Sequence, residues 1–284
     1  MNIFEAENLY FLGPEGTYAH SAMQKFVKNL DIKAKNIIPV FPITAVFKAI
    51  EKDKSAIAVL PIENSIEGIV RETIDNLVKL EDKNFKIVAE TVIPINHCLM
   101  SKSTDKADIK EVISHAQALG QCSGYLCKNF PNVRITPAAS TSEAAKSLQD
   151  KDKTHAAIAA EVAANLYGLN ILDRNINDVL DNKTRFILLA RGERPSTGYD
   201  KTSIFFSVNN EPGALFNVLS IFNMYKINML FIDSRPSRKK MGEYNFSIDL
   251  EGHQTDAKVE AALNLASEYT GNLIVTGSYP RFKD

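Results

Sequence analysis

The chain has 284 residues, of which 45% are hydrophobic and 24% are charged, and its formal net charge is −1 at pH 7. This length suits two domains, or one bilobal domain with a smaller one, and the composition is typical of a globular protein with an ample core. The near-neutral charge gives no general attraction to nucleic acid or to anionic membranes, so we expect neither as a partner.

Other features of the composition indicate the compartment and the kind of chemistry. No apolar run approaches the length of a transmembrane helix, and residues 1–7 lack the pattern of a signal peptide. The three cysteines are an odd number without a disulfide pattern, which favours a reducing cytoplasm. The five histidines show no metal-ligand spacing, and no G-x-G-x-x-G follows a strand. We therefore expect no metal, no cofactor and no NAD-linked dehydrogenation.

The first elements along the chain predict an α/β sheet. Residues 9–12 are apolar and predict a strand, followed by a tight polar turn over residues 13–18 and a helix through residues 21–30. Strand and helix signals then continue to alternate with short loops between them, which is typical of α/β folds.

The segment 56–68 joins a strand to a polar corner. Residues 56–60 are an apolar run that predicts a buried strand, and Pro61 is expected to end it. Asn64 and Ser65 then stand where the next helix should begin, since both residue types favour helix N-caps. A helix N-terminus offers free N–H groups to an anion, so the corner either binds a ligand or simply caps the helix.

A second lobe is expected in the middle of the chain. Residues 85–100 are rich in β-forming types and interrupted by Pro94, so we expect two strand segments that cross between subdomains. Further strand and helix signals over residues 112–167 complete another α/β set, and residues 185–190 form an apolar strand that returns to the first sheet. A chain that leaves one lobe, builds a second and comes back leaves a cleft between them, where small ligands commonly bind.

The last part of the chain predicts a separate small domain. Residues 192–200 are polar and contain Gly and Pro, as in a linker. Beyond it the signals follow the order β-α-β-β-α-β, which is the ferredoxin-like arrangement, at residues 202–208, 213–225, 227–233, 243–250, 255–269 and 272–280.

Several segments together resemble the signature blocks of prephenate dehydratases. They are residues 11–18 (FLGPEGTY), 61–68 (PIENSIEG) and 184–186 (TRF). Residues 115–122 (HAQALGQC) resemble a further block, although the family more often has Pro at the position of Ala116 and Ala at that of Gly120.

Two later segments resemble the phenylalanine-contact motifs of ACT domains. They are residues 210–215 (NEPGAL) and 232–236 (IDSRP), in which Asp233 replaces the usual Glu. The resemblance thus covers nearly the whole chain.

The resemblance implies the domain organisation. We expect a bilobal, periplasmic-binding-protein-like α/β catalytic region over residues 1–191, with lobe one at about 1–84 and 177–191 and lobe two at about 85–176. A linker over residues 192–200 and a ferredoxin-like (βαββαβ) ACT regulatory domain over residues 201–284 follow. Only about eight residues precede the first strand, too few for a chorismate mutase domain, so we expect a monofunctional enzyme.

The resemblance also implies a reaction, the decarboxylative dehydration of prephenate to phenylpyruvate in L-phenylalanine biosynthesis by a carbon–oxygen lyase. Thr184 is implied as the acid or hydrogen-bond donor to the leaving hydroxyl, since a Thr hydroxyl can donate. Arg185 either anchors a carboxylate or makes an interlobe salt bridge, and Phe186 is either a wall beside the substrate ring or strand core. The polar corners implied in substrate binding contain Thr17, Asn64, Ser65, Ser140 and Thr141.

Regulation by L-phenylalanine is implied through the ACT domain. Gly213 lets a ligand approach the start of the following helix, whose N-terminus can receive a carboxylate. Because such a pocket is expected across a contact between two ACT domains, the chain should be a homodimer or homotetramer. The implied allosteric residues are Asn210, Gly213, Ala214, Leu215, Asn228, Met229, Leu230, Asp233 and Ser234.

Two other functions remain open from the sequence. Arogenate dehydratase differs only in the side chain of its substrate, where an amino group replaces the keto group. A non-catalytic amino-acid-sensing or solute-binding protein would use the same bilobal cleft and ACT domain, but it would not need the intact Thr184-Arg185-Phe186 segment.

Overall fold

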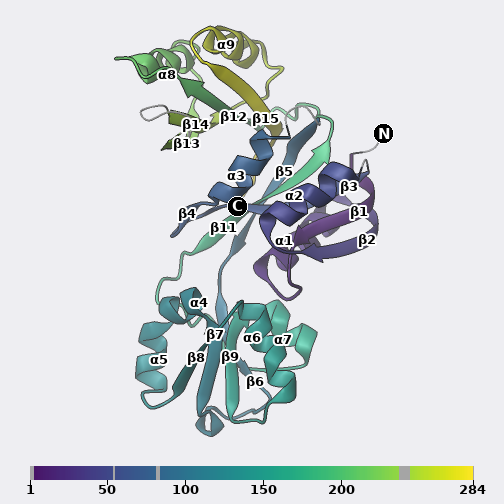
Figure 1. Cartoon of the computed structure of the whole chain (residues 1–284), viewed down its shortest axis with the longest axis vertical. Helices are drawn as coiled ribbons and strands as arrows, with labels where there is room; N and C mark the ends of the chain where they lie inside the picture. The colour runs from purple at the N-terminus through teal and green to yellow at the C-terminus, as the bar shows by residue number, and fades with distance from the viewer. Residues whose placement is uncertain (1–2, 54, 81–83, 237–243, 284) are drawn as a thin grey trace.

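The computed structural model of the chain describes residues 3–53, 55–80, 84–236 and 244–283. They form two α/β lobes and a C-terminal domain, arranged along the long axis of the molecule with lobe one in the middle (Figure 1). Each part has its own β-sheet, so the predicted fold class is confirmed.

Lobe one is built on a mixed sheet in the order β2-β1-β3-β11-β5, and the short β4 pairs with β3. Strand β1 is parallel to its two neighbours, whereas β11 is antiparallel to β3 and β5. The strands are β1 (Glu5–Leu12), β2 (Lys33–Val40), β3 (Ala56–Asn64), β4 (Gly68–Ile69), β5 (Phe85–Pro94) and β11 (Lys183–Arg191).

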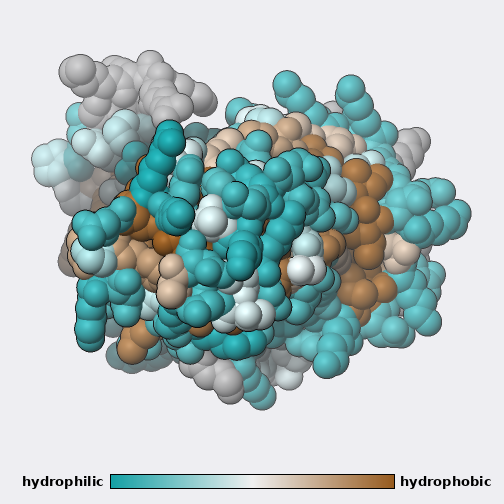
Figure 2. Space-filling view, turned by 90° about the horizontal axis from the view of Figure 1, so that it is seen from below, coloured by the Kyte–Doolittle hydropathy of each residue, from teal (hydrophilic) through white to brown (hydrophobic). Residues whose placement is uncertain are grey.

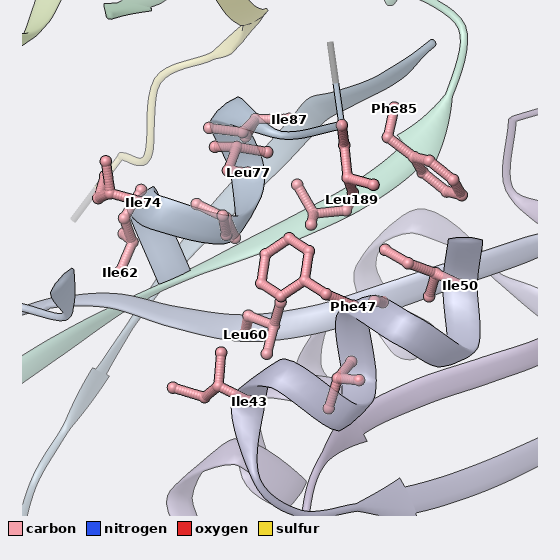
Figure 3. Packing of buried hydrophobic residues seen from close by; sticks show 14 of the residues in the cluster. Ile43, Phe47, Ile50, Leu60, Ile62, Ile74, Leu77, Phe85, Ile87 and Leu189 are labelled. Atoms are coloured by element: carbon pink, nitrogen blue, oxygen red, sulfur yellow. The ribbon is translucent and has the colours of Figure 1, made fainter. Parts of the chain in front are cut away.

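Helices cover both faces of this sheet. Helix α1 (Tyr18–Leu30) packs on one face, and α2 (Ile43–Lys52) and α3 (Arg71–Val78) pack on the other (Figure 3). Along β3, Leu60 points to α2 and α3 while Val59 points to α1. A strand that is buried on both faces needs apolar residues at every position, which explains the continuous apolar run.

Lobe two contains a second mixed sheet in the order β10-β6-β9-β7-β8. Its strands are β6 (His97–Ser101), β7 (Glu111–His115), β8 (Arg134–Ala138), β9 (His155–Ala160) and β10 (Asn170–Asp173). Its helices are α4 (Ala116–Gln121), α5 (Ser123–Asn129), α6 (Thr141–Ser147) and α7 (Glu161–Tyr167), with the 3₁₀ turns η2 (Lys106–Asp108) and η3 (Leu148–Asp150).

The chain crosses between the lobes twice. Strand β5 pairs with β11 in the sheet of lobe one, so the first crossing lies at residues 95–96. The second crossing lies between β10 and β11, at residues 174–182. The first crossing is therefore later than the expected boundary at residue 85, because the whole of β5 stays with lobe one.

The C-terminal domain has the predicted βαββαβ order and an antiparallel sheet in the order β13-β14-β12-β15. Its two helices pack on one face of that sheet. The elements are β12 (Asp200–Val208), α8 (Ala214–Met224), β13 (Met229–Pro236), β14 (Tyr244–Glu251), α9 (Ala257–Glu268) and β15 (Asn272–Pro280).

The other face of that sheet packs directly on lobe one. Phe205, Ile274 and Tyr279 belong to the same buried cluster as the residues of α2, α3 and β5. At Gly277 the backbone of β15 lies so close to that of Ile87 that a Cβ atom would be 2.3 Å from the Ile87 carbonyl oxygen. The C-terminal domain is therefore joined to lobe one by a continuous apolar core.

Two predicted boundaries were wrong. Strand β3 continues through Pro61 to Asn64, and α3 begins at Arg71 with Val70 as its N-cap, so Asn64 and Ser65 do not cap a helix. The register of β3 against β11 shifts between Arg185 and Phe186, opposite Pro61, and such an irregularity tolerates a residue without an N–H group.

Candidate active site

A cleft of about 560 Å³ opens between the two lobes. Lobe one contributes the ends of β1, β3 and β11 with the start of α1, and lobe two contributes the ends of β6 and β7 with the starts of α4 and α6. Six of the predicted site residues line this cleft, and they are Thr17, Asn64, Ser140, Thr141, Thr184 and Phe186.

Thr184 lies in β11 directly opposite Asn64 of β3 and is only 8% exposed. The side-chain oxygen of Asn64 accepts the N–H groups of Ile66 and Glu67, at 3.0 and 2.9 Å. Its amide nitrogen therefore faces Thr184 and donates to Oγ1 at 2.8 Å. Because the hydroxyl oxygen is used as an acceptor, the Thr184 O–H remains available as a donor.

Ser65 does not line the cleft. Its Oγ accepts the Lys183 N–H at 2.9 Å and donates to the Asp181 carbonyl at 3.3 Å. Ser65 therefore holds the segment that leads into β11, and the geometry does not support the predicted contact with substrate.

Arg185 points away from the cleft. Successive side chains of a strand face opposite sides, so Thr184 and Phe186 face the cleft while Arg185 faces the C-terminal domain. There its guanidinium lies 2.6 Å from the carboxylate of Asp249. The geometry supports neither a carboxylate anchor for the substrate nor a salt bridge between the lobes.

Two polar turns, one before α1 and one before α6, lie on opposite sides of the cleft. Thr17 caps α1 by accepting the His20 N–H at 3.3 Å, and Ser140 caps α6 by accepting the Glu143 N–H at 3.0 Å. The Ser142 hydroxyl donates to the Glu15 carbonyl and so joins the lobes. Thr17 and Ser140 each cap a helix, as predicted, and both also line the cleft, so a contact with substrate stays a prediction.

A buried polar chain in the cleft was not predicted. The Tyr18 hydroxyl lies 3.0 Å from Nδ1 of His97, and Nε2 of His97 lies 3.1 Å from the Gln121 side-chain oxygen. Burial lowers the pKa of His97 and raises that of Tyr18, so both side chains are neutral at pH 7. Gln121 lies within the sequence block of residues 115–122, whereas nothing in the sequence distinguishes His97 from the other histidines.

The cleft favours chemistry by hydrogen bonding rather than by strong acids or nucleophiles. The described residues that line it include Glu67 and His115 but no Lys or Arg, so the negative charges of a ligand would meet side-chain and backbone hydrogen-bond donors. Cys122, next to Gln121, is buried, and burial raises the pKa of its thiol to about 12. Such a thiol is a poor nucleophile at neutral pH.

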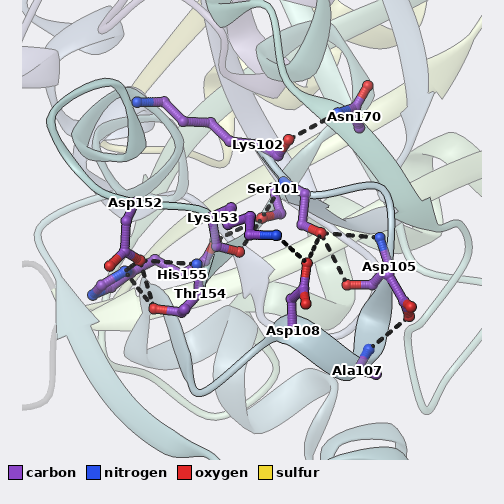
Figure 4. Close-up of polar contacts among 11 residues, drawn as sticks. Ser101, Lys102, Asp105, Ala107, Asp108, Asp152, Lys153, Thr154, His155 and Asn170 are labelled. Carbon is purple, nitrogen blue, oxygen red and sulfur yellow. Dashed lines mark hydrogen bonds and ion pairs between the residues drawn. The ribbon is translucent and has the colours of Figure 1, made fainter.

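A second polar cluster lies at the far end of lobe two (Figure 4). Ser101 donates to the His155 carbonyl at 2.7 Å, and hydrogen bonds from Thr154 and His155 lower the pKa of Asp152 to about 2. These groups bind mainly one another and the backbone, so they hold the ends of β6 and β9 together. The surface at the lobe-two end of the molecule is mostly hydrophilic, with hydrophobic side chains in separate patches (Figure 2).

The predicted effector residues lie on the surface of the C-terminal domain. Gly213 has φ 82° and is the N-cap of α8, a conformation that favours glycine. Asp233 and Ser234 lie on β13, which pairs with β14 and is an edge strand among the described strands. Asn210 and Asn228 are exposed in the loops before α8 and before β13.

Among the described residues no three His, Cys, Asp or Glu side chains are grouped as metal ligands require. The helices of the described part of the chain are all too short or too polar to cross a membrane.

Comparisons with known proteins agree with the sequence blocks. A family model described as prephenate dehydratase matches residues 9–194, and one described as ACT domain matches residues 202–264. The chain is 42% identical to the bifunctional chorismate mutase/prephenate dehydratase of Aquifex aeolicus, over 95% of this chain and 73% of that protein. It is 38% identical to the prephenate dehydratase of Methanocaldococcus jannaschii, over 95% of this chain and 96% of that protein.

A solved structure has the same architecture. The crystal structure of prephenate dehydratase from Arthrobacter aurescens in complex with L-Phe superimposes with a TM-score of 0.85 at 33% identity. The match covers 96% of this chain and 90% of that one.

Proposed function

The chain belongs to the prephenate dehydratase family and is a prephenate dehydratase with an ACT regulatory domain, and we propose that Thr184 is its catalytic hydrogen-bond donor. The substrate itself supplies the driving force. Prephenate is a cyclohexadiene with a carboxylate and a hydroxyl on opposite ring carbons, and loss of both makes the ring aromatic. The enzyme must orient the ring and help the hydroxyl to leave as water while carbon dioxide is lost.

The position of Thr184 carries this proposal. Its hydroxyl is buried on the cleft wall with the oxygen already bonded to Asn64, so the O–H is directed to a ligand. Phe186 is two residues further along the same face of β11 and provides an apolar surface beside the ring. A donor fixed before the reaction stabilises charge that develops on a leaving oxygen.

We propose that the substrate carboxylates are held by the polar corners rather than by Arg185. Thr17, Asn64, Ser140 and Thr141 all line the cleft, and the start of α1 adds backbone N–H groups. The neutral His97 and Gln121 extend this set of polar groups on the side of lobe two.

The experiment that tests the role of Thr184 compares Thr184→Val with Thr184→Ser in an assay of phenylpyruvate formation from prephenate. Valine keeps the β-branched shape and removes the hydroxyl, so kcat should fall by roughly 100-fold or more, whereas serine should retain most of it. Parental kcat in Thr184→Val, with unchanged circular dichroism, would refute the assignment. The same assay with arogenate measures the preference between the two substrates.

Regulation and assembly form the second part of the proposal. L-Phenylalanine binds the ACT domain near Gly213 and β13, and that surface joins two copies of the chain in a homodimer or homotetramer. The support is that β13 is an edge strand of the described sheet and that the ACT domain exposes large apolar side chains, among them Phe216 of α8 and Ile232 of β13. A cytoplasmic location is supported by the three cysteines, which are all free.

A further inference from the structure

Arg185 joins the ACT domain to two strands of lobe one. Its side chain is 10% exposed, and Nη1 lies 2.6 Å from Oδ2 of Asp249 and 3.3 Å from Oε2 of Glu90. Its Nε lies 3.0 Å from Oε2 of Glu63. Asp249 belongs to β14, Glu90 to β5 and Glu63 to β3, so one guanidinium contacts three strands besides its own.

The carboxylate of Asp249 is held in one orientation. It is buried, and Oδ1 accepts the Ser203 hydroxyl at 2.5 Å, which in turn lies 2.7 Å from the Tyr279 hydroxyl. Lys201 supplies a second cation, 3.0 Å from Glu90. Burial by itself would lower the pKa of Arg185, but the carboxylates of Asp249 and Glu90 raise it overall, so the guanidinium stays charged.

This cluster lies next to Thr184, on the opposite face of the lobe-one sheet. In the register of β3 against β11, Thr184 is opposite Asn64 and Arg185 is opposite Glu63. The hydrogen bond between Thr184 and Asn64 lies on the cleft face of the sheet, and the ion pair between Arg185 and Glu63 lies on the ACT face. The two pairs therefore hold the strands together from both sides, immediately before the register shift at Phe186.

From this geometry we propose that Asp249 of the ACT domain is a positioning residue for Thr184, acting through Arg185. The proposal rests on the assignment of Thr184 made above. Asp249 fixes the guanidinium, the guanidinium fixes the backbone of β11 next to Thr184, and the hydroxyl then points at the leaving group. Catalysis demands placement of such a group to within about 0.5 Å, so a small shift of β11 is enough to lower turnover.

Domain docking is the alternative role of the cluster. The ACT domain, however, is also held by the shared apolar core and by a hydrogen bond from Lys86 to the Val275 carbonyl. Loss of one charge at Asp249 should therefore leave the domain docked. A docking role predicts a lower melting temperature with parental kcat, whereas a positioning role predicts a lower kcat in the folded enzyme.

The test uses the full chain with Asp249→Asn, which keeps the shape and the acceptor for Ser203 and removes the charge. We expect kcat to fall by roughly tenfold while KM for prephenate changes by less than about threefold, since the substrate-binding corners are untouched. The matched control is Glu251→Gln, two residues along the same strand, whose partner Arg281 lies within the ACT domain. It should leave both constants unchanged.

A double-variant cycle decides whether Asp249 acts through Arg185. If it does, Asp249→Asn causes little further loss of kcat when Arg185→Lys is already present. Full additivity, or parental kcat in folded Asp249→Asn, would overturn the inference. If Asp249→Asn does not fold, Ser203→Ala serves instead, because it frees the same carboxylate, and parental kcat in that variant overturns the inference equally. Parallel assays of the parent and Thr184→Val show separately whether the assignment of Thr184 itself stands.

Discussion

At the scale of single residues, the side-chain amide of Asn64 determines whether the Thr184 hydroxyl donates or accepts a hydrogen bond toward the cleft. Two backbone N–H groups occupy the oxygen of Asn64, so its nitrogen must face Thr184 and must donate. A hydroxyl that accepts a hydrogen bond from the protein keeps its own proton for the substrate. The loop that follows β3 therefore orients Asn64 so that the Thr184 O–H is left to donate, as the proposed role requires.

Asn64→Asp tests this direction. Aspartate still accepts hydrogen bonds from the two backbone N–H groups, but it cannot donate one to Thr184. Instead, it accepts a hydrogen bond from the Thr184 hydroxyl, which is then no longer available to the substrate. We expect kcat to fall by roughly 100-fold, the typical effect of losing one preorganised donor. The measurement is steady-state kinetics with prephenate. Ser65→Ala removes the hydrogen bond to the Lys183 N–H but leaves the cleft lining and the Asn64 donor in place, so its kcat should fall by clearly less than that of Asn64→Asp. Equal losses in the two variants would contradict the distinction drawn between these neighbours.

His97 should make stability depend on pH. Burial lowers its pKa in the folded protein, so the unfolded chain binds the proton more readily. Its contribution is fully present above the unfolded value of about 6.5 and is lost as the pH falls through the folded pKa. His97→Gln should therefore melt at temperatures that change less between pH 7.5 and pH 5 than those of the parent. If the melting temperatures of the two proteins change by the same amount between pH 7.5 and pH 5, another group, such as the half-buried His20, controls the pH dependence.

Residue identities were predictable here, but side-chain directions were not. Thr184, Phe186 and Asn64 stand in recognisable blocks, and all three reach the cleft. Arg185 stands in the same block, yet strand alternation turns it to the other face. Direction depends on the register of β11 with its neighbours, which are distant in sequence.

At the scale of elements, β11 is the strand that contributes side chains both to the cleft and to the contact with the ACT domain. It pairs with β5 over its whole length and with β3 from Thr184 to Leu189, and its alternate residues face the cleft and the ACT domain. The sequence predicted β11 as a returning strand from its apolar run. It did not indicate that β5 belongs to lobe one, because a strand that is buried in either sheet has the same pattern.

Gly277→Ala tests the contact between β15 and β5. A Cβ atom there would lie 2.3 Å from the carbonyl oxygen of Ile87, and backbone cannot move away as a flexible side chain can. We expect a loss of about 1–3 kcal/mol, seen as a fall of several degrees in the melting temperature. Gly120→Ala in α4 is the control, since an added Cβ would have no atom within 4 Å apart from its chain neighbours and its own helix backbone, and alanine favours the helix. If the melting temperature fell equally in both variants, the close approach of Gly277 to Ile87 would not be the cause of the lost stability.

At the scale of the whole molecule, lobe two and the ACT domain lie on opposite sides of lobe one (Figure 1). The cleft is formed by lobes one and two, so it lies on the side of lobe one away from the proposed effector surface. Between them, Phe231 of β13 lies with its ring centroid 5.7 Å from the Arg185 guanidinium, and Arg235 pairs with Asp75 of α3. The edge strand that carries the proposed phenylalanine contacts therefore touches lobe one at two points, one of them next to Thr184.

Assembly can be tested on the exposed apolar side chains of the ACT domain. Phe216 is 71% exposed and Ile232 is 47% exposed, and an open edge strand favours pairing with another copy. The parent should sediment as a dimer or larger, and Ile232→Lys should shift it to smaller species and weaken inhibition by L-phenylalanine. Ile135→Lys on β8, the edge strand of lobe two, should change neither. Unchanged sedimentation of Ile232→Lys would exclude this edge as the contact.

The apolar core shared by lobe one and the ACT domain has a consequence for how the protein unfolds. Phe205, Ile274 and Tyr279 complete a cluster that α2, α3 and β5 cannot close alone, so removal of the ACT domain would leave part of that cluster in water. We therefore expect the regulatory domain and lobe one to unfold as a single unit in calorimetry. Lobe two has its own two clusters, and it meets lobe one through two chain crossings and polar contacts such as those of Ser142 with Glu15 and of Tyr18 with His97. Lobe two is therefore expected to open by itself, with native-state hydrogen exchange that is faster than in the rest of the chain.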